Sequence, residues 1–308
     1  MQYEITYGKR RVPVYRTHAA PLAGIRAIPE SPFTGKSNEL VAVEVDTEVY
    51  GEDFLPAYTE GDNSMVVATD SMKNFVIRET LTWDGATLES LAYHLANGIS
   101  STYEYLRDLR LTVRELPFGG VPVPGDGGFA PSDNLFESRR ADYGEATLRL
   151  QRGEGTATAI VDHQCFRRDI HLMKLTGSAF TAFVRDGYTT LPERGDRPLY
   201  VFMETSWRYG DPADALGTDP ARYVPSEQIR DICSTVFAEF VSESIQQLVH
   251  VMGQRILERF PQLAEVGFVA TNRTRDPYGE RPAGDGGGAK VYSDPFPAFG
   301  NITLTIRR

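Results

Sequence analysis

The 308-residue chain has little of several features that would narrow its function. It holds only two cysteines, Cys165 and Cys233, and neither stands in a CxxC or Cys/His spacing typical of metal sites. Two buried free thiols in a reducing cytosol are therefore expected. The chain also lacks an apolar signal core and any apolar run long enough to cross a bilayer. These absences predict a cytoplasmic protein with no membrane partner.

Positive charge is also scarce. Lysine and arginine number 32 against 42 acidic residues, giving a net charge of -10 and a pI near 5.1. An acidic protein repels phosphate backbones, which argues against nucleic acid as the partner. The one compact basic run is Lys9-Arg10-Arg11. A small anion can bind only where the site itself is locally positive.

The common sequence motifs of catalysis are missing too. There is no G-x-G-x-x-G, no P-loop and no G-x-S-x-G, and the glycine clusters at 125–129 and 284–288 are predicted to be loops. The five histidines form no HxH, HxxxH or HExxH pattern. Sequence chemistry alone therefore indicates no metal, no cofactor site and no standard hydrolase.

Hydrophobic periodicity predicts the same order of elements in each half of the chain. In the first half we expect strands at 3–16, 39–50 and 64–68, helices at 70–82 and 87–106, a Gly/Pro loop at 117–133, and strands at 109–116 and 143–152. In the second half we expect strands at 156–162, 170–175, 180–184 and 199–207, a helical stretch at 226–260 interrupted at 241–244, a loop at 275–288, and strands at 266–270 and 302–306.

This order predicts an α+β fold made of two tandem units, 1–150 and 151–308. Each unit is expected to be an antiparallel four-stranded sheet with two helices on one face. Such a unit leaves one sheet face and two strand edges that need cover, which favours oligomerisation.

Several polar residues stand at positions where a core would not require them. Lys9 follows Tyr7-Gly8 on the first strand, and Thr69 ends an apolar run. Taken singly, they suggest a solvated lysine and a helix cap. Arg197 alone suggests a surface ion pair, and Gln246 a surface glutamine.

Together with their neighbours these residues resemble one family, cofactor-independent urate oxidase (uricase), in its bacillar branch. The similarity covers nearly the whole chain and rests on these stretches: Tyr7-Gly8-Lys9 with Val12; DNSMVVATDSMKN at 62–74; SAFTAFVRDGYTTLPERGDRPL at 178–199; Ser244-Ile245-Gln246; and Asn272 after VGFVAT. The resemblance implies the tunnelling fold (T-fold), with two tandem β2α2β2 units per chain. It also implies a homotetramer whose active sites lie at subunit interfaces.

The resemblance further implies oxidation of urate by O2, without metal or flavin, to 5-hydroxyisourate and H2O2. Arg197 and Gln246 would grip the edge of the planar anion, which suits a guanidinium fork and an amide. Phe180 would stack on the ring and Leu191 would line the wall. The backbone N–H of Ile245 would donate to a urate oxygen from a helix start.

Proton transfer in the family uses a lysine–threonine pair, here Lys9 and Thr69. A threonine hydroxyl is too weak a base alone, but a neighbouring lysine can take its proton. Asp70 would bind substrate through its backbone N–H from the neighbouring chain. Asn272 would hold the position above the ring where O2 and later water sit.

The chain departs from the family pattern after this asparagine. Many relatives carry a histidine two residues further on, whereas here Arg273 and Thr274 follow. The altered segment leaves open an oxidase of a related oxopurine. A non-catalytic purine-binding protein and a pterin or GTP enzyme of the same fold are further alternatives. Retention of Lys9 and Thr69 argues against mere binding, and the lack of a metal-ligand cluster argues against a cyclohydrolase.

Overall fold

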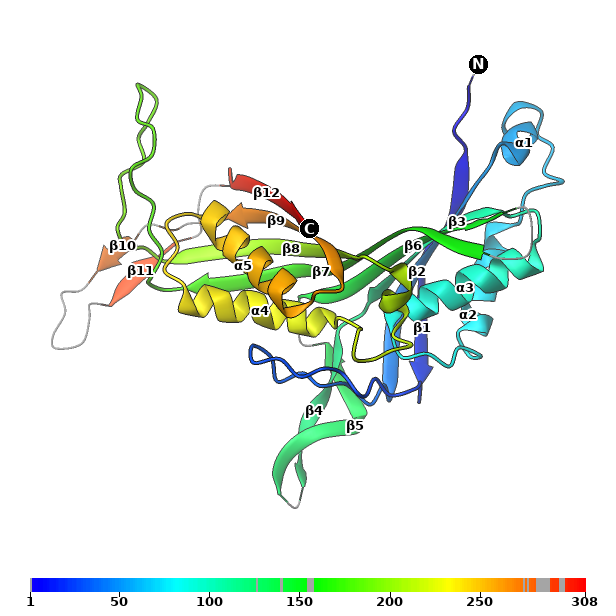
Figure 1. The fold of residues 1–308 in the computed structure, drawn as a ribbon, viewed down its shortest axis with the longest axis horizontal. Coiled ribbons are helices and arrows are strands. Elements are labelled where there is room, and N and C mark those ends of the chain that lie inside the picture. The colour runs from blue at the N-terminus through cyan, green and yellow to red at the C-terminus, as the bar shows by residue number, and fades with distance from the viewer. Residues whose placement is uncertain are drawn as a thin grey trace.

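The computed structural model describes residues 2–125, 127–138, 141–153, 158–273, 275, 277–280, 289–293 and 297–308. Its centre is one antiparallel eight-stranded sheet in the order β1-β2-β3-β6-β7-β8-β9-β12 (Figure 1). The first half supplies β1 (Thr6–Thr17), β2 (Leu40–Tyr50), β3 (Asp108–Glu115) and β6 (Tyr143–Arg152). The second half supplies β7 (Thr158–Lys174), β8 (Leu199–Tyr209), β9 (Leu263–Asn272) and β12 (Gly300–Arg307).

The principal helices pack on one face of this sheet (Figure 1). They are α2 (Thr69–Glu79), α3 (Leu88–Thr102), α4 (Ser226–Glu239) and α5 (Ile245–Arg259). Two apolar cores lie between sheet and helices, one under α2 and α3 and one under α4 and α5. Short helical turns complete the layer: η1 (Glu52–Phe54), α1 (Leu55–Thr59) and η2 (Pro212–Leu216). The predicted α+β class, with two helices over each set of four strands, is confirmed.

The opposite sheet face is charged and carries ion pairs such as Arg114–Asp46 at 2.9 Å and Arg168–Glu145 at 2.7 Å. A charged face remains solvated at little cost. It therefore does not need the protein cover that we expected, and the strand edges β1 and β12 remain the features that call for a partner.

Four predicted strands are wrong. Of 156–162 and 170–175, residues 158–162 and 170–174 belong to one strand, β7, because Arg167 in the polar interval is buried and ion-paired to Asp142 rather than marking a break. Residues 64–68 form a turn followed by extended chain, in which Val66 N–H donates to Asn63 C=O at 3.0 Å. Residues 180–184 contribute only one isolated bridge, at Phe180.

The Gly/Pro segment at 117–133 is also not a loop. It forms most of a hairpin, β4 (Phe118–Gly125) with β5 (Gly128–Ser138), that projects from the sheet (Figure 1). Within the predicted loop at 275–288, β10 (Pro277–Glu280) is a short strand that pairs antiparallel with β11 (Lys290–Tyr292), which follows that loop. The glycine cluster at 284–288 lies outside the described residues.

The two halves repeat each other in detail. A bulge follows Lys9 in β1 and places Arg11 at φ 57°, and a bulge follows Arg167 in β7 and places Asp169 at φ 58°. Positive φ is unusual for residues other than glycine, so a matching pair is informative. Arg167 stands 158 residues after Lys9, and the same spacing separates Asp169 from Arg11.

Candidate functional site

Lys9 lies on the helix-facing side of β1, opposite Thr47 of β2. Alternate residues of a strand share a face, so Lys9 lies on the same side as Tyr7. The hydroxyl of Tyr7 accepts a hydrogen bond from the backbone N–H of Val67 at 2.9 Å, which ties the chain just before α2 to β1. Lys9 therefore lies beside the N-terminus of α2.

Thr69 and Asp70 form that N-terminus, with Thr69 as the first helical residue. The expected cap by Thr69 is wrong, because Ala68 holds the N-cap position and provides no side-chain bond. The carboxylate of Asp70 is exposed and binds Lys73 at 2.5 Å. The hydrogen bond and charge of Lys73 lower the pKa of Asp70, and the charge of Lys9 adds a smaller effect in the same direction. The structure thus brings Lys9, Thr69 and Asp70 together.

Phe180 and Arg197 come together in the connection between β7 and β8. Phe180 exchanges backbone hydrogen bonds with Arg194 at 2.8 and 3.1 Å, and Arg197 N–H donates to Ser178 C=O at 2.8 Å. The Arg197 side chain is buried, with its guanidinium carbon 5.3 Å from the centroid of the Phe180 ring. Phe183 stacks on the same ring at 4.9 Å. A cation beside an aromatic surface suits a flat anion.

The start of α5 joins this cluster. Ala179 N–H donates to Ser242 C=O at 2.7 Å, so the chain carrying Phe180 is fixed to the residues before the helix. Ser244 is the N-cap, accepting from Gln247 N–H at 3.1 Å. Ile245 is the first helical residue and is buried, whereas the side chain of Gln246 is exposed. Backbone N–H groups in a first turn have no partner within their helix and attract anions.

Asn272 ends β9, between Val201 of β8 and Gly300 of β12. The next residue, Arg273, lies over the ring of Phe202, with its guanidinium carbon 3.6 Å from the centroid, and over the ring of Phe299 at 4.6 Å. Arg273 is thus held between two aromatic rings. Thr274 lies outside the described residues.

Leu191 lies at an exposed position of the β7–β8 connection, with 41% of its surface accessible. No described contact joins it to Phe180 or Arg197, so its place in the cluster remains a prediction.

The two groups of site residues are far apart in one chain. Lys9 on β1 and Asn272 on β9 are six strand spacings apart in the sheet order, about 29 Å at roughly 4.8 Å per spacing. A urate molecule is much smaller than that. One chain therefore holds the predicted site residues as two separate groups, or half-sites, toward opposite ends of its sheet.

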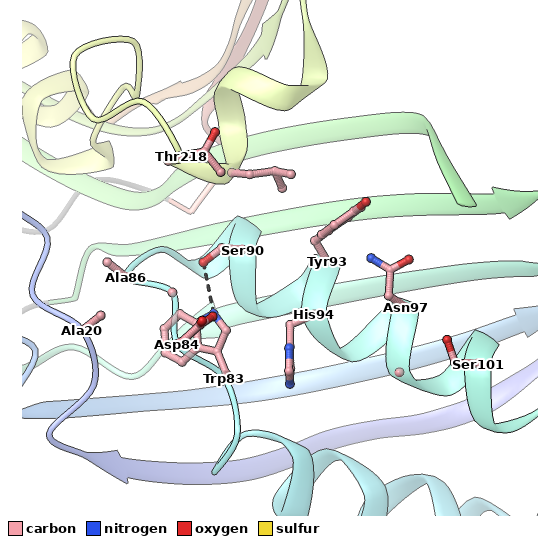
Figure 2. A pocket seen from close by; sticks show the side chains of 14 residues that line it. Ala20, Trp83, Asp84, Ala86, Ser90, Tyr93, His94, Asn97, Ser101 and Thr218 are labelled. Carbon is pink, nitrogen blue, oxygen red and sulfur yellow. Dashed lines mark hydrogen bonds between the residues drawn. The ribbon is translucent and has the colours of Figure 1, made fainter. Parts of the chain in front are cut away.

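The most voluminous cavity among those described is a different one. It measures about 640 Å³ and lies along α3, between Tyr93, His94 and Asn97 on one side and residues 216–218 on the other (Figure 2). Of its described lining residues only Asp84 carries a full charge at neutral pH, and that charge is negative. An anionic substrate would be repelled, so this cavity is a poor candidate for the site.

The described part of the chain contains no group of three or more His, Cys, Asp or Glu side chains arranged to hold a metal ion. None of its helices combines the length and apolarity that crossing a membrane requires.

The sequence assigned Phe183 no role in the site. It stacks on Phe180, and its place three residues further on was the available signal. The position of Arg273 over two aromatic rings was also not predicted, because stacking partners from two other segments have no local sequence signal.

Comparison with known proteins finds similarity to one family. The sequence profile of the Uricase family matches residues 167–303. The uricase of Haloferax volcanii is 48% identical over 272 residues, covering 88% of each chain. The bifunctional uric acid degradation protein of Bacillus subtilis is 42% identical over the whole chain, which spans 62% of that protein. The crystal structure of urate oxidase from Bacillus sp. TB-90 superposes with a TM-score of 0.94 at 41% identity, covering 99% of this chain and 100% of that one. The chain belongs to the uricase family.

Proposed function

We propose that the protein is a urate oxidase that converts urate, O2 and water to 5-hydroxyisourate and H2O2 without metal or flavin. The observation that carries the proposal is the convergence of Phe180, Arg197 and the start of α5, which joins an aromatic surface, a buried cation and helical N–H donors. Membership of the uricase family supports the same substrate.

In this proposal the second half of the chain binds the substrate. Arg197 donates two parallel hydrogen bonds to a urate oxygen and an adjacent anionic nitrogen, and Gln246 donates and accepts at the same edge. The N–H of Ile245 donates to a further oxygen. Phe180 stacks on the ring, contributing about 1 kcal/mol beyond the buried area. Leu191 closes the wall of the pocket.

The first half of a second chain supplies the chemistry. Thr69 and Lys9 remove a proton from urate, and Asp70 N–H holds the ring in place. The resulting dianion gives one electron to O2, the two radicals combine at C5 to form a hydroperoxide, and H2O2 leaves. Water then adds at C5, so that urate, O2 and water balance with 5-hydroxyisourate and H2O2. Asn272 holds O2 and later this water above the ring.

The internal repeat provides a register for this assembly. Within one chain β6 pairs with β7 and sets Gly144 opposite Arg167, the counterpart of Lys9. Arg114 pairs with Glu145, so Glu115 lies opposite Gly144 on the other side of β6. In the second half Asn272 lies opposite Gly300 in the same way, so β12 corresponds to β6 and Gly300 to Gly144. If β12 of one chain pairs with β1 of another as β6 pairs with β7, Lys9 lies opposite Gly300 and next to Asn272.

We accordingly propose that two tandem units, 1–150 and 151–308, build each chain, and that four chains form a homotetramer with its sites at the interfaces. Two unpaired sheet edges per chain favour such closure. A cytoplasmic location is proposed as well, since Cys165 and Cys233 are both buried and unbridged.

No histidine follows Asn272, and we propose that the Lys9–Thr69 pair suffices. Arg273 is committed to the two rings that enclose it and is poorly placed to relay protons. An arginine also stays protonated at any pH at which the protein is folded.

The test is to add urate to protein stripped of metals and to follow urate absorbance, O2 uptake and peroxide together. Equal rates of the three are expected. No turnover until metal or flavin is added would contradict the proposal. Faster turnover of another oxopurine, such as xanthine, would favour the alternative oxidase.

A further inference from the structure

The repeat gives every residue of the half-sites a counterpart in the other half of the chain. Phe180 pairs with Arg194 in an isolated bridge, and Leu22 pairs with Lys36 in another. Each member of the later pair stands 158 residues after its counterpart. Val201 pairs with Asn272 across two strands, and Val43 pairs with Glu115 in the same way. Val201 stands 158 residues after Val43, and Asn272 stands 157 residues after Glu115. The counterparts can therefore be named without ambiguity.

The counterparts of Lys9 and Thr69 are Arg167 and Ser226. Ser226 is the first residue of α4, as Thr69 is the first residue of α2. The Arg167 side chain is only 3% exposed, and its Nη1 donates to Ser226 Oγ at 3.2 Å. A cation and a hydroxyl from a strand bulge and a helix start thus meet again in the second half. The cation is now an arginine, which cannot accept the proton of the hydroxyl.

The counterparts of the substrate-binding residues have lost the features that would bind urate. Leu22 occupies the position of Phe180. The same spacing of 158 residues makes Glu39 the counterpart of Arg197. The N-caps Thr87 and Ser244 match, so Glu89 replaces Gln246. Glu115 replaces Asn272. An aromatic surface and a cation have become an aliphatic side chain and an acid, and no purine anion is attracted to that pair.

These two sets of counterparts meet inside one chain, unlike the half-sites themselves. Arg167 Nη1 lies 3.3 Å from Glu115 Oε2, across the β6–β7 junction. Lys36 lies beside this pair, with its Nζ 3.5 Å from Glu115 and 3.7 Å from Glu227, the counterpart of Asp70. The cavity that Lys36 shares with Leu22, the counterpart of Phe180, measures about 30 Å³. That volume holds one or two water molecules, whereas small-molecule pockets usually exceed about 300 Å³. Lys36 also lines a separate cavity of about 350 Å³ with Phe118 and Arg230, whose described lining residues include no counterpart of Phe180, Arg197 or Gln246.

We propose that each chain carries a second, closed copy of the site at the junction of its two halves, in which the ammonium group of Lys36 takes the place of substrate. This copy binds no purine and instead joins the halves through ion pairs. The proposal rests on the proposed function, because only that function makes Lys9, Thr69 and Asn272 a site to be copied.

Electrostatics at the junction agree with this role. Burial opposes ionisation of Glu115, but the charges of Lys36 and Arg167 outweigh it and hold the pKa of Glu115 below its usual value. The Lys36 side chain is 38% exposed, so burial opposes its charge only in part, and Glu115 and Glu227 together raise its pKa. Both shifts favour the charged forms of Glu115 and Lys36, and removing Lys36 leaves its two carboxylate partners less compensated.

Binding stoichiometry tests the proposal first. Urate is added to the protein under nitrogen, where it cannot be oxidised, and bound urate is counted by equilibrium dialysis. One urate per chain is expected. Two per chain would overturn the closed copy, whereas no binding at all would overturn the proposed function instead.

Substitution tests the ion pairs. Lys36→Met should lower the midpoint of thermal unfolding by about 3 °C or more, with kcat and KM per chain within about twofold of the parent. The double variant Lys36→Met with Glu227→Gln should regain much of that loss, since it also removes the carboxylate whose ion pair is with Lys36. Arg185→Met, at an exposed ion pair with Glu193, is the control and should shift the midpoint by about 1 °C at most. A double variant less stable than Lys36→Met, or a Lys36→Met protein that unfolds like the parent, would overturn the proposal.

Discussion

Glu89 makes the stability of this protein dependent on pH in an unusual direction. It lies in the first turn of α3, yet it is only 3% exposed. Burial raises its pKa from 4.5 to about 7, a shift only partly offset by hydrogen bonds from its own backbone, Cys165 and Tyr223. The Tyr223 hydroxyl lies 3.1 Å from its carboxylate.

The sign follows from proton linkage. Between pH 4.5 and about 7 the folded protein keeps a proton on Glu89 that the unfolded chain has released. Stability therefore falls as pH rises through this range and then levels off. The rise in the pKa of Glu89 from 4.5 to about 7 lowers the free energy of unfolding by about 3 kcal/mol per chain above pH 7.5. This loss corresponds to about 5 °C in the unfolding midpoint.

Glu89→Gln removes the ionisation and retains an amide that can bond to Tyr223. We expect the variant to unfold about 5 °C above the parent at pH 8 and close to it at pH 5. Scanning calorimetry from pH 5 to 8.5 measures both, and Glu104→Gln, at an exposed position, is the matched control. The reasoning is refuted if Glu89→Gln unfolds below the parent at pH 8, or if the difference between the two proteins does not change with pH.

Three further predictions concern the site and its assembly. Lys9→Met should lower kcat by about 10²-fold or more with a smaller change in KM, measured by O2 uptake, because it removes the proton acceptor and leaves the substrate-binding residues intact. Arg197→Gln should instead raise KM strongly, and an unchanged KM in steady-state kinetics would contradict its role in binding the anion. Thr6→Cys with Thr303→Cys should form a disulfide between chains under mild oxidation, because the β6–β7 register, transferred to β12 and β1, sets these positions opposite each other. The pair Thr6→Cys with Thr305→Cys is two residues out of register, and gel electrophoresis should show it to cross-link much less.

Much of the fold could be predicted because its elements carry strong periodicity. The strand at 39–50 is observed as Leu40–Tyr50, and the polar break at 241–244 does separate α4 from α5. The β4–β5 hairpin could not be predicted, because its strands are rich in glycine and proline and both faces are largely exposed. Arg167 misled the prediction of β7, since a buried arginine is satisfied by partners distant in sequence.

The candidate site was predictable from its resemblance and not from local chemistry. Phe180 and Arg197 are brought together by a connection without regular structure, which periodicity does not describe. Glu89 looked like an ordinary acidic residue in a first helical turn, a position that favours negative charge on a solvent-exposed helix. Its burial follows from the packing of α3 against the second half, where Tyr223 contacts it.

The central claim is that one catalytic site needs two chains, since Lys9 and Asn272 lie about 29 Å apart in one sheet. The most direct test is to produce Lys9→Met and Arg197→Gln chains together in equal amounts and to measure urate oxidation by the mixed oligomers. Each variant alone should be nearly inactive. Random pairing gives about one site in four an intact Lys9 from one chain and an intact Arg197 from another, so about a quarter of the parent activity should return. Mixed oligomers no more active than the separate variants would contradict the account.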